Sequence, residues 1–195
     1  RELKPIVKEY DHADRYPHDI VEQMKEMGLF GATISQEYGG LGLPATTYAK
    51  LVMIISSVWM SITGIFNSHL IMSLAVEKFG TDEQKAEWLP KFASGEIRGG
   101  LGLTEPDAGT DLQGIRTTAK WNGSEYVING TKTWISNGIE GSCIALLVKT
   151  DPSAEPRHKG MSLFIAPKQA GFTVGKKMEK LGYKCIDSGE LVFDN

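Results

Sequence analysis

The sequence predicts an α+β protein with an N-terminal all-α domain over residues 1–96 and an all-β, barrel-like domain over residues 97–195. Two observations predict this. Before about residue 97 the apolar side chains recur with helical spacing. After it they fall into short runs separated by frequent turn signals, which is typical of strands in a barrel or sandwich.

The beginning of the chain predicts two amphipathic helices followed by a loop. Ile6 and Tyr10 lie on the apolar stripe of the first helix. Pro17 can open the second, and Gly28 is positioned to stop it. Residues 29–43 carry glycines at four positions, so we expect a loop there.

Three further helices are expected before residue 97. One begins near Tyr48, is mostly apolar and should be buried, and a second contains residues 70–78. Thr81-Asp82-Glu83-Gln84 is a capping-box pattern that predicts the start of the last helix. Pro90 should break or restart that helix before Gly95.

The second half contains two Asn-Gly dipeptides, at residues 122–123 and 129–130, which favour tight turns with positive φ. Together they would separate three strands, and apolar runs farther along the chain predict four more. The expected strands cover residues 115–121, 125–128, 131–136, 143–148, 161–165, 172–174 and 190–193.

Composition excludes several classes of protein. A net charge of −3 gives no electrostatic basis for binding nucleic acid. The longest apolar candidate, residues 51–66, is interrupted by Ser, Thr and Gly, so we expect no transmembrane segment. Cys143 and Cys185 show no metal-ligand spacing, and we expect both to be reduced, a disulfide between them being the alternative.

Two short motifs carry most of the functional information. Residues 101–111, LGLTEPDAGTD, form an apolar strand that runs into a Thr-Glu-Pro corner and a loop of small residues. Residues 133–138, TWISNG, place a large flat ring beside a hydroxyl group at the end of another strand. Such parts suit a flavin, because they offer backbone donors, room for a pyrophosphate and a platform for one ring face.

Together these motifs resemble the two flavin-contacting signatures of the acyl-CoA dehydrogenase family, and the similarity runs in order along the whole chain. The resemblance implies the first two domains of that family, FAD as cofactor, and an acyl-CoA substrate. It also implies a C-terminal helical domain, absent from this chain, which supplies the glutamate base. No catalytic residue is therefore expected among these 195 residues.

The resemblance assigns nine residues to the cofactor. In the family, Thr104 bonds the edge of the flavin ring, the ring of Trp134 lies beside it, and Ser136 bonds its N5. Gly109 and Thr110 lie where a pyrophosphate oxygen is bound, although Asp107 departs from the usual Gly or Ala. The alternatives are a capping Thr, a core Trp and an ordinary acidic turn. The full set is Leu101, Gly102, Leu103, Thr104, Gly109, Thr110, Trp134, Ile135 and Ser136.

For the substrate, the resemblance points to Thr110 and to Thr63, Gly64 and Asn67 on the helical stretch that lines the acyl pocket, with plain helix packing as the alternative. Glu105 is expected to be structural, and Asp111 a turn residue. No metal motif is present, and His69 is expected to be packed in the core.

The implied activity is the α,β-dehydrogenation of an acyl-CoA to the trans-2-enoyl-CoA, with electrons passed to an electron-transfer flavoprotein. A homo-oligomer, either tetramer or dimer, and a location in the bacterial cytoplasm or the mitochondrial matrix follow from the same resemblance. The alternatives are an acyl-CoA oxidase, a flavin monooxygenase or a nitroalkane oxidase of the same fold, a non-catalytic relative that binds flavin or acyl-CoA, and an interaction protein without cofactor.

Overall fold

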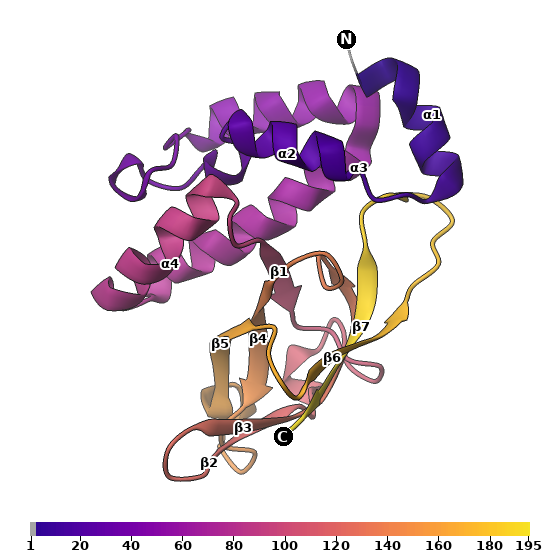
Figure 1. Cartoon of the computed structure of the whole chain (residues 1–195). Coiled ribbons are helices and arrows are strands. Elements are labelled where there is room, and N and C mark those ends of the chain that lie inside the picture. The colour runs from indigo at the N-terminus through magenta and orange to yellow at the C-terminus, as the bar shows by residue number, and fades with distance from the viewer. Residues whose placement is uncertain (1–2) are drawn as a thin grey trace. The chain divides into compact units, whose positions relative to one another are not determined.

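The computed structural model describes residues 3–195 and divides into two compact units. The helical unit contains the described residues through Arg98 and, from much later in the chain, Glu179–Asp187. The sheet unit contains Gly99–Met178 and Ser188–Asn195. The predicted fold class is confirmed, since helices occupy the first half of the chain and strands the second (Figure 1).

The helical unit contains four α-helices and two short 3₁₀ turns. Gly28, with a φ of 71°, follows the second helix as predicted. The capping box at the start of α4 is also confirmed, because Thr81 Oγ1 accepts from the Gln84 N–H and Gln84 Oε1 accepts from the Thr81 N–H. The elements are α1 (Leu3–Ala13), α2 (His18–Glu26), Leu29–Gly31, Gln36–Tyr38, α3 (Ala45–Phe79) and α4 (Asp82–Ser94).

Pro90 lies inside α4 and does not break it, contrary to expectation. Leu89 and Phe92, on either side of the proline, are fully buried, and this packing holds both halves of the helix in place. The helix ends at Gly95, whose φ of 74° is left-handed. Tertiary burial therefore outweighs the local cost of the proline.

The prediction of two helices over residues 48–78 is confirmed, because α3, labelled as one 35-residue element, consists of two helices that meet at a kink at Trp59, where φ is −153° and ψ is 98°. The expected burial of its first part is wrong, since Met53 and Ile54 are each 70% exposed. By length and composition alone α3 could cross a membrane, but buried core helices meet the same criteria, so the absence of a transmembrane segment stays a prediction. From Trp59 onward, however, most of its side chains are buried within the helical unit.

The sheet unit is a curled seven-stranded sheet whose main path runs β1-β4-β2-β3-β7-β6, with β5 paired to β4 (Figure 1). Most pairs are antiparallel, but β1 runs parallel to β4. An apolar cluster that includes Ile135, Ile144 and Leu191 forms its core. The strands are β1 (Gly99–Gly102), β2 (Thr118–Trp121), β3 (Tyr126–Ser136), β4 (Cys143–Lys149), β5 (Met161–Pro167), β6 (Phe172–Lys177) and β7 (Ser188–Asp194).

The two Asn-Gly dipeptides behave differently. The first lies in the loop between β2 and β3, where Asn122 Oδ1 accepts from the N–H groups of Ser124 and Glu125. The second does not form a turn, because β3 continues through Gly130. Gly130 has a φ of 149°, and a Cβ there would lie 2.7 Å from Thr117 Cα. The glycine therefore permits a close approach of backbones rather than a change of direction.

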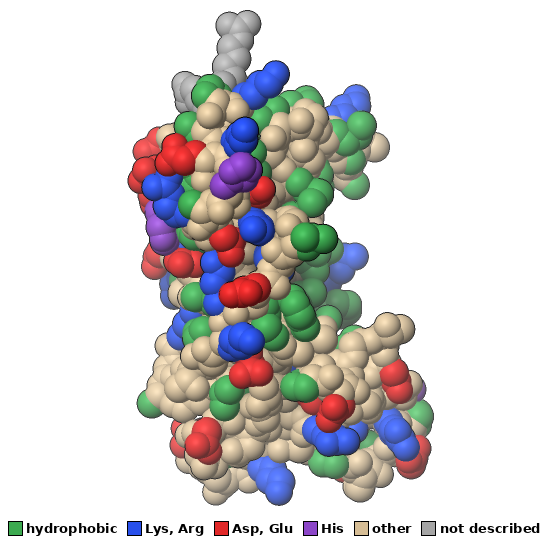
Figure 2. Space-filling view, turned by 90° about the vertical axis from the view of Figure 1, so that its right-hand side faces the viewer, with side chains coloured by type: hydrophobic (Ala, Val, Ile, Leu, Met, Phe, Trp, Pro, Cys, Tyr) green, Lys and Arg blue, Asp and Glu red, His purple; other side chains and the backbone are tan. Residues whose placement is uncertain are grey.

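The two cysteines and the surface charges agree with the sequence-based expectations. Cys143 and Cys185 are both buried and do not form a disulfide, as predicted, and burial raises the pKa of Cys143 to about 12. On the face shown in Figure 2, Lys and Arg side chains are interspersed with Asp and Glu. That face thus carries no large field of one sign.

Candidate functional site

The two motifs singled out in the sequence lie side by side in the sheet unit. The Thr133 N–H donates to the carbonyl oxygen of Thr104 at 2.9 Å, and Asn137 Nδ2 donates to the carbonyl oxygen of Gly99 at 2.8 Å. A Cβ on Gly100 would lie 2.4 Å from the Ser136 carbonyl oxygen. These contacts join β1 and the loop after it to the end of β3, so the structure brings the predicted cofactor residues of the sheet unit together.

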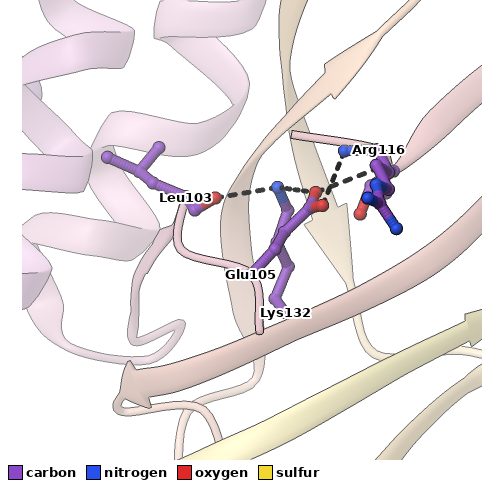
Figure 3. Close-up of polar contacts among 5 residues, drawn as sticks. Leu103, Glu105, Arg116 and Lys132 are labelled. Carbon is purple, nitrogen blue, oxygen red and sulfur yellow. Dashed lines mark hydrogen bonds and ion pairs between the residues drawn. The ribbon is translucent and has the colours of Figure 1, made fainter. Parts of the chain in front are cut away.

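A buried ion pair links Glu105 of the first motif to Lys132, the residue before the second motif (Figure 3). Lys132 Nζ donates to Glu105 Oε1 at 2.8 Å and to the Leu103 carbonyl oxygen at 2.9 Å. The carboxylate also accepts from the N–H groups of Arg116, at 2.6 Å, and Thr117, at 3.0 Å. The side chains are 0% exposed for Lys132 and 6% for Glu105. Both charged groups of the pair are thus hydrogen-bonded inside the protein.

Opposing effects set the charge state of this pair. Burial acts to raise the pKa of Glu105, but the hydrogen bonds from Lys132 and from two backbone N–H groups outweigh it and leave that pKa below its ordinary value. Burial lowers the pKa of Lys132, and Glu105 opposes that change. Glu105 is therefore a structural carboxylate, as expected. Lys132, its partner, was not found from the sequence.

A β-bulge in β3 turns Trp134 outward. The pairing of β3 with β7 shifts register between Lys132 and Ile135, and Trp134 between them has a φ of 60°. Its side chain is 54% exposed, so the alternative of a core tryptophan is wrong. Ile135 is 2% exposed and belongs to the apolar core, so only its backbone is available to a ligand. Ser136 follows at the end of the strand, half-buried and opposite Ser188.

The loop that follows Thr104 is closed by two backbone hydrogen bonds between Glu105 and Ala108. Gly109 and Thr110 come next and are exposed, and a Cβ on Gly109 would have only Thr104 Cγ2, at 3.9 Å, as a near neighbour. The exposed Asp107 pairs with Arg116 at 3.3 Å. Asp111 accepts from the Gln113 N–H and begins a 3₁₀ turn, as expected of a turn residue.

The remaining three cofactor candidates lie in or just after β1. Leu101 and Leu103 are half-buried. Gly102 is buried, and a Cβ there would lie 2.6 Å from Ile144 Cγ2 on the neighbouring strand β4. The glycine at this position is thus explained by strand packing alone.

The substrate candidates on α3 lie in the helical unit, whereas Thr110 lies in the sheet unit. Thr63 is buried, and its hydroxyl bonds to the Met60 carbonyl and to the Ser56 hydroxyl. Asn67 Oδ1 accepts from the Tyr48 hydroxyl at 2.8 Å. A Cβ on Gly64 would lie 1.9 Å from the Tyr183 hydroxyl oxygen.

Tyr183 was not found from the sequence, because it is distant from α3 along the chain and reaches the helix through the segment Glu179–Asp187. Burial raises the pKa of Tyr183. Burial, and after it the electrostatic effect of the neighbouring Tyr183, raises the pKa of Tyr48 to about 12. Both phenols are therefore neutral hydrogen-bonding groups at physiological pH.

His69 lies in the core of the helical unit, as expected. Its Nε2–H donates to the Phe92 carbonyl oxygen at 3.0 Å, and the rings of Phe30 and Phe92 contact it edge-on. Burial lowers the pKa of His69 to about 4, so the ring is neutral. Within residues 3–195, no three His, Cys, Asp or Glu side chains are grouped so as to hold a metal ion.

Comparisons with known proteins agree with this geometry. Residues 1–96 match the model of the acyl-CoA dehydrogenase N-terminal domain, and residues 100–195 match that of the middle domain. The chain is 38% identical to a short-chain specific acyl-CoA dehydrogenase of Clostridium acetobutylicum, with 100% of this chain and 51% of that protein covered.

Two solved structures show the same fold. One, described as an electron transferring flavoprotein of Acidaminococcus fermentans, has a TM-score of 0.93 and 35% identity, with 98% of this chain and 50% of that chain covered. An acyl-CoA dehydrogenase complexed with FAD from Bacillus anthracis has a TM-score of 0.87 and 31% identity, with 99% of this chain and 33% of that chain covered. The chain spans about half the length of the curated relatives it matches. With both domain models matched in order, the chain belongs to the acyl-CoA dehydrogenase family.

Proposed function

We propose that the complete protein is an FAD-dependent acyl-CoA dehydrogenase that converts an acyl-CoA to the trans-2-enoyl-CoA and passes the electrons to an electron-transfer flavoprotein. The observation that carries this proposal is the bond between the Thr133 N–H and the Thr104 carbonyl oxygen, which brings the two flavin motifs together. A relative of the same fold has been solved in complex with FAD.

The residues of the sheet unit fit a flavin. The bulge leaves the Trp134 side chain 54% exposed, two residues before Ser136 on the same strand. Open space around Gly109 leaves room for a phosphate near the exposed backbone of that loop. Asp107 would repel a phosphate, but its carboxylate is 70% exposed and paired with Arg116. When bound, FAD supplies a hydride acceptor for the β-carbon of the substrate.

Each residue then has a defined task. Thr104 offers its N–H and hydroxyl to the polar edge of the ring, Ser136 donates to N5, and Trp134 covers one side of the ring. Thr110 faces the boundary between cofactor and substrate. Thr63, Gly64 and Asn67, in the helical unit, line the acyl pocket.

The proton on the α-carbon requires a base that these residues do not supply. The Glu105 carboxylate accepts three hydrogen bonds, from Lys132 and from the N–H groups of Arg116 and Thr117, and Asp111 begins a 3₁₀ turn. We assign the base to a glutamate in the C-terminal domain of the complete protein. A homotetramer or homodimer in the bacterial cytoplasm or mitochondrial matrix completes the proposal, in keeping with the bacterial and mitochondrial relatives.

The proposal is tested by anaerobic titration of the full-length protein with a panel of acyl-CoAs of different chain length. Bleaching of the flavin absorbance by one class of acyl-CoA is the expected result. A bound flavin that no acyl-CoA bleaches would contradict the assigned reaction. Rapid reoxidation of the reduced flavin by air, with product bound, would favour the oxidase or monooxygenase alternatives.

Two exposed tryptophans of the sheet unit provide a matched control. Trp134 is 54% exposed and Trp121 is 58% exposed, but only Trp134 lies beside Ser136. Trp134→Ala should weaken flavin binding and alter the flavin spectrum, whereas Trp121→Ala should do neither. Equal effects of the two substitutions would show that Trp134 is not part of the flavin site.

A further inference from the structure

We propose that Lys132 is a positioning residue that tunes the bound flavin through the peptide group between Leu103 and Thr104. This inference rests on the proposed function, because it concerns how the chain treats a flavin at Thr104. Lys132 itself touches neither cofactor nor substrate, since its ammonium group is fully buried behind the loop.

The contact that carries the inference is the 2.9 Å hydrogen bond from Lys132 Nζ to the Leu103 carbonyl oxygen (Figure 3). That carbonyl and the Thr104 N–H belong to one peptide group. A cation on the oxygen draws electrons from the nitrogen, so the N–H becomes a stronger donor. Among residues 3–195, no acceptor takes the Thr104 N–H, and it remains available to a ligand.

The ion pair has a fixed orientation. Glu105 is held by the N–H groups of Arg116 and Thr117, and the ammonium of Lys132 lies between this carboxylate and the Leu103 oxygen. The pair therefore presents its positive end to the peptide group. On the other side of Thr104, its carbonyl is fixed by the Thr133 N–H. The Leu103–Thr104 peptide group is thus bonded at its oxygen and polarised in one direction, while the next peptide group is anchored through the Thr104 carbonyl.

The direction of the effect on the flavin follows from charge. Reduction places negative charge on the ring system, and a polarised N–H at the polar edge stabilises the reduced form more than the oxidised form. Lys132 should therefore raise the midpoint potential of the bound flavin. A purely structural role would loosen the loop and weaken the binding of both forms alike.

The test measures the midpoint potential and the affinities for oxidised and reduced FAD of the full-length protein and its variants. Lys132→Met combined with Glu105→Gln removes both charges while keeping similar side-chain volumes. The affinity for reduced FAD should fall about tenfold more than that for oxidised FAD, which corresponds to a potential about 30 mV more negative. Lys120→Met, at an exposed position on β2, is the matched control and should leave the potential unchanged.

Glu105→Gln alone provides a test of sign. It leaves the ammonium without its carboxylate, so the potential should become more positive than that of the wild type. The double and the single variant are measured independently, and either one that folds and binds FAD tests the inference. An unchanged or more negative potential in Glu105→Gln would overturn the inference.

The other outcomes are equally decisive. A double variant with the wild-type potential, or one that folds but binds neither form of FAD, would show that Lys132 acts only in holding the loop. A wild-type protein without affinity for FAD would instead refute the proposed function. Failure of the inference and failure of the proposed function are thereby distinguished.

Discussion

Within residues 3–195, each unit buries one titratable nitrogen completely, and the two units do so in opposite ways. Lys132, in the sheet unit, keeps a charged partner in Glu105 at 2.8 Å. His69, in the helical unit, lies between two phenylalanine rings, and burial holds it neutral. Both side chains are 0% exposed. The charge is retained where a loop needs fixed geometry, and it is removed where packing alone is required.

The largest effect is expected from breaking the charged pair on one side. Lys132→Met leaves the Glu105 carboxylate buried without its cation, and the free energy of unfolding should fall by about 3–5 kcal/mol. Denaturant unfolding of the full-length protein measures this loss. Adding Glu105→Gln should restore much of it, because the second charge is then also absent. A single variant as stable as the exposed-site control Lys120→Met would contradict the comparison.

The neutral histidine should appear as a pH dependence of stability. The pKa of His69 is about 4 in the folded protein, below the ordinary value of 6.5. Between pH 4 and pH 6.5 the unfolded chain therefore binds more protons than the folded protein does. Stability due to His69 is therefore present above pH 6.5 and declines as the pH falls toward 4, by about 3 kcal/mol in all. His69→Gln should remove this component of the profile. Identical profiles for the two proteins would show that His69 is not buried as a neutral ring.

A smaller effect is expected at Gly64, where packing involves no charge. An added methyl group would meet the Tyr183 hydroxyl, which is part of a 38% exposed side chain and can shift. Gly64→Ala should cost about 1–3 kcal/mol. The same substitution in a Tyr183→Leu background should cost clearly less. The costs are measured by thermal or denaturant unfolding. Equal costs in the two backgrounds would show that Tyr183 does not limit the space at Gly64.

The smallest effect is expected at the exposed counterpart of the buried pair. Asp107 and Arg116 form an ion pair with side chains 70% and 80% exposed. Asp107→Asn should change the free energy of unfolding by at most about 1 kcal/mol. The measurement is best made at low and high salt, because screening should abolish even this small difference. A loss comparable to that of Lys132→Met would refute the role assigned to burial.

Much of the fold could be predicted because it depends on local patterns. The capping box at Thr81 and the stop at Gly28 require only neighbouring residues, and both are confirmed. The continuation of β3 through Gly130 could not be predicted, since the glycine serves a close approach to Thr117. The same holds for Pro90, where buried neighbours maintain the helix.

The candidate site shows the same division. The motifs around Thr104 and Trp134 could be found from their residues, and the structure brings them together. Lys132 could not be recognised, because a lysine in a strand is normally exposed and its partner lies 27 residues earlier. Tyr183 could not be recognised either, because its segment, Glu179–Asp187, joins the helical unit only in the folded chain.

The central claim is that the loop after β1 and the bulged end of β3 form one flavin site. A crystal structure of the full-length protein with FAD tests it most directly. We predict the flavin ring within hydrogen-bonding distance of Thr104 and Ser136, with Trp134 beside it and Lys132 still bonded to the Leu103 oxygen. A flavin bound elsewhere, or a ring that contacts only one of the two motifs, would contradict the claim.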